Sequence, residues 1–293
     1  MRSQRLVEIL QLNPQRDHQR IVHLDVCYEF PFDTTRALEF ALFRTYCVPS
    51  ISALLDHTCE FVKHPQKRYS DTDMMVSELM EWGYDSERGA QALARMNCIH
   101  GHFNIANENF VYVLSTFIFE PIRWNARFGW RTMCEQEKLA MFYFWRAVGL
   151  RMGMHDIPET YAVFERFNLD YERQQFKFAE SNYRIGCATR DLFASWSPAP
   201  LRPLVRHVIY ALLDEPVRVA FGFPKALPGL RSVVTGALKL RALALRFWPA
   251  RREPRLRTHM QQAAVYPSGY QLSKTGPAHM DLSSACKKPR EHA

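Results

Sequence analysis

The sequence lacks the glycine-rich motifs that mark several common enzyme classes. Its 293 residues contain no Gly-x-Ser-x-Gly, no phosphate-binding loop of the Walker type and no Gly-x-Gly-x-x-Gly. These absences argue against the common hydrolase, nucleotide-binding and dinucleotide-binding classes. No Glu-x-x-His pair occurs either, so a di-iron site of the helical-bundle type lacks its usual ligands.

Paired cysteine motifs and long apolar runs are also missing. The seven cysteines form no Cys-x-x-Cys pair and lie mostly in apolar periodic segments, which predicts reduced, buried thiols. The longest strongly apolar run, residues 110–119, is far shorter than the roughly 20 residues of a membrane-spanning helix. The N-terminal residues show no secretory signal. These features predict a cytoplasmic protein, either soluble or peripheral at a membrane surface.

The composition is that of an ordinary globular protein. Hydrophobic residues make up 47% and charged residues 23%, so a full core can be buried. We expect one large domain, residues 21–257, with an N-terminal arm, residues 1–20, and a polar C-terminal tail, residues 258–293, that is extended or partly disordered. The 20 Phe, 12 Tyr and 6 Trp could fill a core or wall a large flat cofactor.

The net charge of +8 is concentrated near the C-terminal end of the predicted domain. Between residues 239 and 257, basic residues alternate with Leu, Phe and Trp. One interpretation is a solvated helix end, and the other is an interfacial segment that attracts anionic lipid head groups. Neither zinc-ligand spacing nor an RNA-binding strand motif accompanies the charge, so nucleic acid is not expected as a partner.

The local patterns predict helices almost throughout. Strand-like alternation is scarce and hairpin dipeptides such as Asn-Gly are absent. After Arg190, prolines are expected to break the chain into short helices. The earlier helices are expected at residues 34–53 (capped by Asp33 and interrupted at Pro49), 70–83 (from a cap at Ser70), 86–103, 107–119 (halted by Pro121), 135–151 and 156 to about 183 (capped by Asp156).

His100 lies on the apolar face of the helix predicted over residues 86–103. Gly89, Leu93, Met96, His100 and Phe103 recur at steps of four and three, the period of one buried face. The imidazole therefore points inward. It is either a core histidine bonded to a carbonyl or an axial ligand of haem iron, which needs a neutral imidazole in an apolar slot. Met96 and Phe103 would line that slot.

A divalent-metal phosphohydrolase is a weaker interpretation. It would use His155-Asp156 together with His100 or His102. Asp156 is explained equally well as a helix cap. Residues two positions apart point about 200° apart around a helix, so His100 and His102 cannot both face one metal ion while the helix continues.

Arg68 and Thr72 stand at the start of the helix predicted from Ser70. A helix N-terminus offers free N–H groups, and a guanidinium beside it makes a place for a carboxylate or an iron-bound oxygen anion. The alternative is an exposed arginine in an ordinary capping network, since Asp71 and Asp73 already complement the helix dipole.

Four segments resemble those of a known family. They are Lys67-Arg68-Tyr69-Ser70-Asp71-Thr72, then Arg95-Met96-Asn97-Cys98-Ile99-His100 about thirty residues later, Asn107-Glu108-Asn109-Phe110, and Tyr171-Glu172. In this order and spacing they look like the MpaB and rubber oxygenase (latex clearing protein) catalytic-domain family, especially its shorter MpaB-like members. The resemblance covers roughly residues 20 to 270.

The resemblance implies an all-helical, globin-like core that binds haem b. The proximal haem histidine of the family corresponds to His100, and its active-site arginine and threonine correspond to Arg68 and Thr72. Family members activate O₂ at haem iron and cleave carbon–carbon double bonds of polyisoprenoid chains. Rubber-cleaving relatives carry a lysine directly before the threonine, where Asp71 stands here. For their proposed catalytic glutamate, Glu60 and Asp56 are the candidates.

Our leading hypothesis is a haem-b-dependent oxygenase that acts with O₂ on a hydrophobic, isoprenoid-tailed small molecule. His100 would bind the iron, Arg68 would steady a propionate or the pocket, and Thr72 would help organise the oxygen site. The competing hypotheses are a non-catalytic haem- or lipid-binding helical protein and, less favoured, the metal phosphohydrolase. An apolar substrate also predicts membrane contact through residues 239–257.

Overall fold

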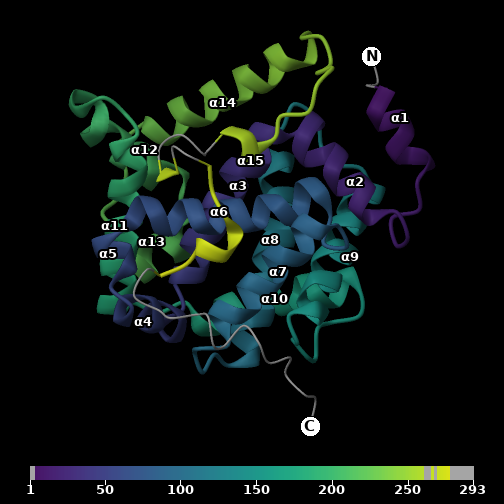
Figure 1. Ribbon diagram of the computed structural model, residues 1–293. Helices are drawn as coiled ribbons and strands as arrows, with labels where there is room; N and C mark the ends of the chain where they lie inside the picture. Colours follow the sequence, from purple (N-terminus) through teal and green to yellow (C-terminus); the bar gives the residue numbers. More distant parts are fainter. Residues whose placement is uncertain (1–3, 261–264, 267–268, 278–293) are drawn as a thin grey trace.

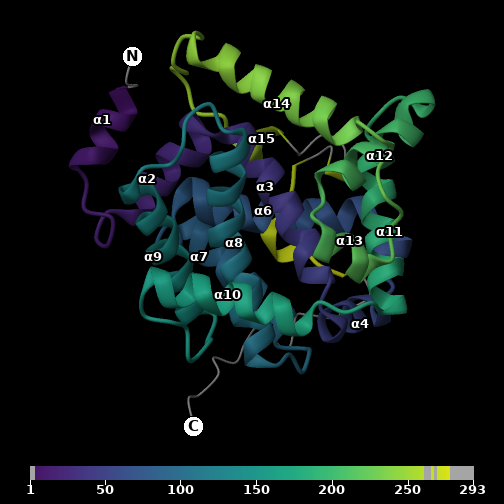
Figure 2. The same ribbon diagram turned by 180° about the vertical axis from the view of Figure 1, so that it is seen from behind.

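Helices make up most of the part of the chain that the structure describes. The computed structural model describes residues 4–260, 265–266 and 269–277, and none of these residues is in a β-strand. The all-α class is therefore confirmed, and the helices gather into one domain (Figures 1 and 2). The more specific expectation of a globin-like core stays a prediction.

The helices differ widely in length. In chain order they are α1 (Gln4–Gln11), α2 (His18–Leu24), the π-helix η1 (Asp25–Glu29), α3 (Pro31–Tyr46), α4 (Pro49–His57), α5 (Glu60–Lys63), α6 (Pro65–Trp82), α7 (Glu87–His100), α8 (Asn107–Phe128), α9 (Glu135–Arg151), α10 (Tyr161–Gln175), α11 (Glu180–Ser195), the 3-10 helix η2 (Ala199–Leu201), α12 (Arg202–Leu212), α13 (Glu215–Phe221), α14 (Leu230–Arg246), α15 (Arg257–Met260) and the 3-10 helix η3 (Leu272–Lys274).

Proline opens three of the central helices. Pro31, Pro49 and Pro65 stand at the start of α3, α4 and α6, where a missing N–H is harmless and the fixed φ suits a helix. Ser86 caps α7 as its hydroxyl accepts a hydrogen bond from the Gly89 N–H at 3.0 Å. A Cβ at Gly89 would lie 2.0 Å from a backbone oxygen of the preceding turn, so only glycine fits there.

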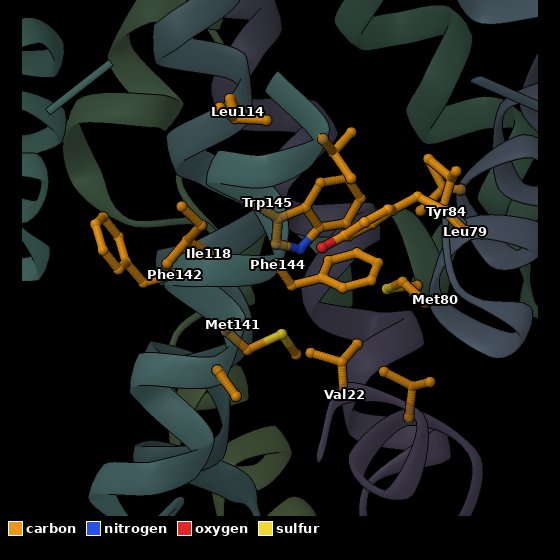
Figure 3. Close-up of a cluster of buried hydrophobic side chains, with 14 of the residues drawn as sticks. Val22, Leu79, Met80, Tyr84, Leu114, Ile118, Met141, Phe142, Phe144 and Trp145 are labelled. Atoms are coloured by element: carbon orange, nitrogen blue, oxygen red, sulfur yellow. The ribbon is translucent and has the colours of Figure 1, made fainter. Parts of the chain in front are cut away.

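The largest apolar core lies where α2, α6, α7, α8 and α9 meet. Figure 3 shows Trp145 and Phe144 of α9 facing Tyr84 and the apolar side chains of α6. Trp145 is 1% exposed and Phe144 is fully buried. Deleting an aromatic side chain from such a site typically costs about 3–5 kcal/mol. A second cluster, which includes Phe43 and Phe221, joins α3 to α11, α12 and α13.

Two helices extend further than the sequence predicted. The helix expected to start at Ser70 begins at Pro65, so Ser70 lies inside it rather than capping it. The helix expected to stop before Pro121 continues to Phe128. A proline inside a helix removes one backbone hydrogen bond, but α8 packs extensively against α3 and α9, and this tertiary contact maintains the helix past the proline.

The predicted helix over residues 156–183 is wrong, since two helices, α10 and α11, occupy this region. Asp156 has φ +57° and is no cap, and Thr160 caps α10 instead. Asp33 was also wrongly assigned as a cap: it lies in the first turn of α3, where it accepts a hydrogen bond from Trp124 Nε1 at 3.1 Å and pairs with Arg241 at 3.0 Å. The interruption at Pro49, the end at Gly83 and the helix 135–151 are confirmed.

The segments expected to flank the domain are partly built into it. Ile9 of α1 is fully buried in the main core, and residue 20 lies within α2. Thr258, where the extended tail was expected to begin, is also fully buried, and its hydroxyl donates to Glu81 Oε2 at 2.6 Å. Much of the predicted tail, including residues 278–293, lies outside the described residues.

α14 lies along one edge of the molecule in both views (Figures 1 and 2). It contains 17 residues, in contrast to the short helices expected after Arg190. Within the described part of the chain, no single helix is long and apolar enough to cross a bilayer. The bent pair α3 and α4, which meet at 96°, reaches the length and composition of a span together.

Candidate functional site

A cavity of about 380 Å³ opens between the central helices. Its wall comes from α3 to α9, the loops after α7 and α9, and residues 276–277. This volume lies within the range of small-molecule sites, which is about 300–1,000 Å³. Most of the lining is apolar, and Leu114, Phe117 and Trp145 form one side of it. A cavity of this kind suits a ligand that is largely apolar.

All five predicted site residues line this one cavity: Arg68, Thr72, Met96, His100 and Phe103. The first two lie on α6, the next two on α7, and Phe103 follows in the loop. The apolar period of α7 therefore identified the inward face correctly, although the helix ends at His100 instead of Phe103. The roles assigned to these residues stay predictions.

Among the described residues, His100 is the only imidazole in the cavity lining. Burial lowers its pKa to about 4, and the positive charge of Arg68 acts in the same direction, so the ring is neutral at physiological pH. Its Nδ1 is buried without a hydrogen-bond partner among the described residues. The ring of Phe110 approaches edge-on, with the centroids 5.3 Å apart. Within the described structure, Nδ1 therefore does not form the hydrogen bond to a carbonyl that the core-histidine interpretation requires.

Arg68 and Thr72 lie one turn apart on α6. The Arg68 guanidinium donates to the Thr72 hydroxyl and stands 5.2 Å from the ring centre of Phe61. Among the described residues it forms no ion pair with a carboxylate. The predicted position at a helix N-terminus is wrong, because the Arg68 N–H already bonds to the His64 carbonyl at 2.9 Å. Arg68 can still offer positive charge to a ligand, but free backbone N–H groups do not contribute.

The two candidate glutamate equivalents occupy different places. Glu60 is 4% exposed and lines the cavity. Asp56 instead pairs with Arg184 at 2.6 Å and is not part of the lining. Asp71, at the position of the lysine in rubber-cleaving relatives, is buried and pairs with Lys67 at 2.6 Å.

Asn109 lies in one of the four segments that resemble the family, but the sequence did not predict it as a site residue. Its Oδ1 accepts hydrogen bonds from the Tyr171 hydroxyl at 2.6 Å and the Ser50 hydroxyl at 3.2 Å. It lines the cavity with Ser50, so it ties α4, α8 and α10 together at the wall. A polar residue on an otherwise apolar helix face was the available sequence signal.

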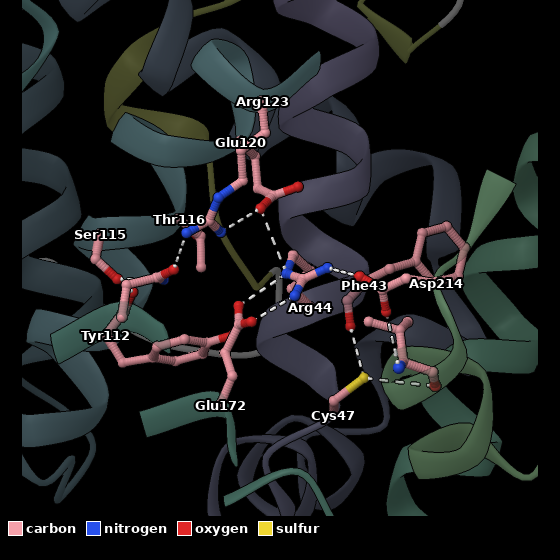
Figure 4. Close-up of polar contacts among 12 residues, drawn as sticks. Phe43, Arg44, Cys47, Tyr112, Ser115, Thr116, Glu120, Arg123, Glu172 and Asp214 are labelled. Atoms are coloured by element: carbon pink, nitrogen blue, oxygen red, sulfur yellow. Dashed lines mark hydrogen bonds and ion pairs between the residues drawn. The ribbon is translucent and has the colours of Figure 1, made fainter. Parts of the chain in front are cut away.

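Glu172, the neighbour of Tyr171, belongs to a largely buried ion network. Figure 4 shows the guanidinium of Arg44 among the carboxylates of Glu172, Glu120 and Asp214. The nearby negative charges outweigh desolvation and raise the pKa of Arg44. The network connects α3 with α8, α10 and the start of α13, and breaking such a pair leaves an uncompensated buried charge. We assign it a structural role.

The residues of the phosphohydrolase interpretation do not meet. His155 and Asp156 contact each other at 2.8 Å with side chains 70% and 89% exposed, and neither lines the cavity. His102 is exposed, and its ring bonds to the Cys98 carbonyl at 2.8 Å. No group of three His, Cys, Asp or Glu side chains in the described part of the chain could hold a metal ion. This arrangement does not support a metal-dependent hydrolase.

The cysteines only partly match the expectation of reduced, buried thiols. Cys27 and Cys47 are free and buried, and burial raises the pKa of both thiols. Cys59 is free but exposed. Cys98, on α7, is disulfide-bonded, which contradicts the expectation for that residue.

Together, the fold and cavity define an all-helical protein whose largely apolar cavity has a neutral histidine and an arginine in its wall. The chain belongs to the family described as "ER-bound oxygenase mpaB/B'/Rubber oxygenase, catalytic domain", whose profile matches residues 41–247. That range includes all five predicted site residues, and the family resemblance seen in the sequence is confirmed.

Fungal relatives agree with this assignment. The chain is 28% identical over 237 residues to the ER-bound oxygenase mpaB' of Penicillium brevicompactum, an alignment that covers 75% of this chain and 56% of the relative. It is 36% identical over 132 residues to the ER-bound oxygenase mpaB of Penicillium roqueforti (strain FM164), covering 43% and 44% respectively. The chain thus spans about half the length of the curated relatives it matches.

Proposed function

We propose that the chain is a haem-b-dependent oxygenase that uses O₂ to oxidise, or to cleave a carbon–carbon double bond of, a hydrophobic small molecule. One observation carries the proposal: a neutral imidazole with an unpartnered nitrogen, within the described structure, stands in the wall of a largely apolar cavity. Membership of an oxygenase family supports the reaction class.

The residues at the cavity fit haem b in their chemistry. A histidine can bind haem iron only through a neutral imidazole, and a pKa of about 4 keeps His100 in that form. A haem also carries two propionates, and Arg68 offers an uncompensated guanidinium among the described residues. Met96 and Phe103 supply apolar surface for the macrocycle. When bound, the haem would supply the redox chemistry with O₂.

The protein would contribute orientation and the exclusion of water. His100 would hold the iron, Arg68 would pair with a propionate, and the Thr72 hydroxyl would offer a polar contact in the oxygen site. Apolar walls favour a substrate with a long hydrocarbon part, for which an isoprenoid tail is our candidate. Glu60, which lines the cavity together with the carboxylate Asp71, is our candidate for proton transfer.

An absorbance spectrum tests the haem ligand. We expect the purified chain, reconstituted with haem b, to show a Soret band that His100→Ala largely loses. His102→Ala is the matched control, because this neighbouring imidazole is exposed and does not line the cavity. Wild-type haem content in His100→Ala would rule out the assignment. Bound haem without O₂ consumption, in the presence of isoprenoid-tailed substrates, would indicate the non-catalytic alternative.

We also propose peripheral membrane contact through part of residues 239–257, for access to a lipid-dissolved substrate. Phe247 and Trp248 at the end of α14 are 83% and 73% exposed, and Leu240 is 67% exposed. Aromatic and aliphatic groups beside basic side chains suit the interface of an anionic bilayer. The two fungal relatives are named ER-bound, which supports the proposal.

A further inference from the structure

The described C-terminal segment, residues 269–277, lies across α6 and α7 and completes the cavity wall. The yellow end of the chain passes in front of α6 in Figure 1. Gly276 and Pro277 line the cavity, and Thr275 is fully buried. We call this segment the strap. An open groove of about 630 Å³ runs along its outer part, where Tyr270 and Leu272 face Arg95 of α7.

Asp71 of α6 is the centre of the strap's attachment. Its side chain is 3% exposed. Its Oδ2 accepts hydrogen bonds from the Gly276 N–H at 2.8 Å and from Lys67 Nζ at 2.6 Å, and its Oδ1 accepts one from the Tyr266 hydroxyl. Lys67 Nζ also donates to the Gly276 carbonyl at 2.6 Å. Both backbone groups of Gly276 are thus bound by one ion pair.

The backbone of the strap fits the wall closely at Gly276. Its φ is +100°, and a Cβ there would lie 2.8 Å from Ile99 Cδ1, so other residues would be strained. Ile99 itself lines the cavity. Further along the strap, Arg95 Nε donates to the Thr275 carbonyl at 2.9 Å, and the Tyr270 hydroxyl donates to Glu78. Polar contacts therefore hold the strap at several points, and Leu272 adds apolar packing against the main core.

Attachment of this kind can be released without unfolding the helices below it. The strap adds only the one-turn helix η3, and its Gly276 contacts depend on one carboxylate. Segments with few apolar contacts open at lower free energy than the core. Replacing the carboxylate with an amide would leave Lys67 without its charge partner and weaken charge-assisted hydrogen bonds, the stronger class.

We propose that Asp71 is a positioning residue that controls ligand access, because it fastens the strap as a removable wall of the cavity. The inference rests on the proposed use of this cavity for a ligand, but not on haem. In the closed form, Gly276 and Pro277 limit the space for an apolar chain. Release of the strap opens the cavity on the side of α6 and α7.

The test compares full-length Asp71→Asn with wild type in haem-free protein. Hydrogen exchange measured by mass spectrometry reports on peptides that cover residues 269–277. We expect exchange there to be about tenfold faster in the variant, the factor that corresponds to 1.4 kcal/mol. Stopped-flow fluorescence with cis-parinaric acid, a long-chain polyene, should show faster uptake by a similar factor.

Two further variants make the test specific. Asp56→Asn removes a carboxylate that pairs with Arg184 outside the cavity, so it should change neither readout. Gly276→Ala should loosen the strap through the contact with Ile99 and reproduce the effect of Asp71→Asn. This second variant keeps the proposal testable if Asp71→Asn folds poorly. Unchanged exchange in both strap variants, or faster exchange with unchanged probe uptake, would overturn the proposal. Failure of the wild-type chain to bind haem would contradict the proposed function and leave these results intact.

Discussion

At the scale of single residues, the site combines a neutral ring with an uncompensated cation. Desolvation, with the positive charge of Arg68 adding to it, keeps His100 unprotonated. Among the described residues, the Arg68 guanidinium contacts the Thr72 hydroxyl and the Phe61 ring, and it pairs with no carboxylate. A cation in that setting binds an anionic group more strongly than one already paired. Geometry thus favours a ligand that is apolar with a negative group at one edge.

Arg68 and Thr72 should therefore separate into two phenotypes. Thr72→Ala removes one hydroxyl and little volume, so we expect near-normal haem content with reduced O₂-dependent turnover. Arg68→Ala removes the charge and should weaken haem retention about tenfold or more, whereas Arg68→Lys should keep part of it. Haem titration and oxygen consumption measure the two effects. Wild-type values for both Ala variants would show that the pair only stabilises α6.

The sequence predicted the direction of a side chain best where the helical spacing of apolar residues decides which face is buried. The spacing of Met96 and His100 follows one helix face whichever residue ends the helix, so their inward direction was predictable. The Ser70-Asp71-Thr72-Asp73 run failed as a cap because its side chains serve other contacts. Asp71 binds the Gly276 N–H 205 positions away and Asp73 binds Arg257 184 positions away. Local sequence holds no signal for partners so distant.

At the scale of helices, the close approach of α8 and α9 shapes the cavity. A Cβ at Gly149 of α9 would lie 2.5 Å from Leu114 Cδ2 and 2.8 Å from Ile157 Cδ1. Leu114 lines the cavity. Because the nearest atom is the end of a flexible side chain, a substitution here would displace Leu114 rather than the backbone. The volume of the cavity therefore depends on a glycine that contacts no ligand itself.

Gly149→Ala should accordingly reduce both stability and ligand capacity. Overpacking a core position typically costs about 1–3 kcal/mol, and the displaced Leu114 should lower the haem content of the purified protein. Gly236→Ala on α14 is the control, since a Cβ there meets nothing within 4 Å and should stabilise the helix by up to about 1 kcal/mol. Urea unfolding and the Soret absorbance measure the two effects. Equal haem content in both variants would disprove the link to cavity volume.

Helix boundaries were less predictable than helix existence. The sequence predicts a helix near each of α6, α7, α8 and α9. The predicted start of α6 and the predicted end of α8 are wrong. Proline explains both errors: Pro65 favours a start that the apparent cap at Ser70 concealed, and Pro121 interrupts only one bond of a helix held by its neighbours. Packing energy from the surrounding helices decides such cases.

At the scale of the whole molecule, the basic stretch 239–257 is less uniform than its sequence. Arg241 and Arg257 form ion pairs with Asp33 and Asp73, both at 3.0 Å. Lys239, Arg251 and Arg252 are exposed, and none of the three is ion-paired with a described carboxylate. Residues 239–257 contain seven basic side chains, and the positive charge that faces outward is therefore smaller than this number suggests. The exposed Phe247 and Trp248 compensate by adding apolar surface at the same place.

Membrane contact through this edge is the prediction for the intact chain. We expect co-sedimentation with anionic liposomes at low salt and weaker binding as salt screens the charges. Each free cation near the surface contributes about 1 kcal/mol, so Arg251→Gln with Arg252→Gln should weaken binding about tenfold or more. Phe247→Ser with Trp248→Ser should weaken binding to any vesicle.

The matched control for the aromatic pair is Val62→Ser with Val163→Ser. These valines are 63% and 57% exposed on α5 and α10, away from α14 in Figure 1, so their loss should leave binding unchanged. Because apolar insertion and charge attraction add, the charge variants should lose their effect on neutral vesicles while the aromatic variants keep theirs. Wild-type protein that binds neither kind of vesicle would show that this edge of the molecule faces only water, and equal binding to neutral and anionic vesicles would contradict the role given to the basic residues.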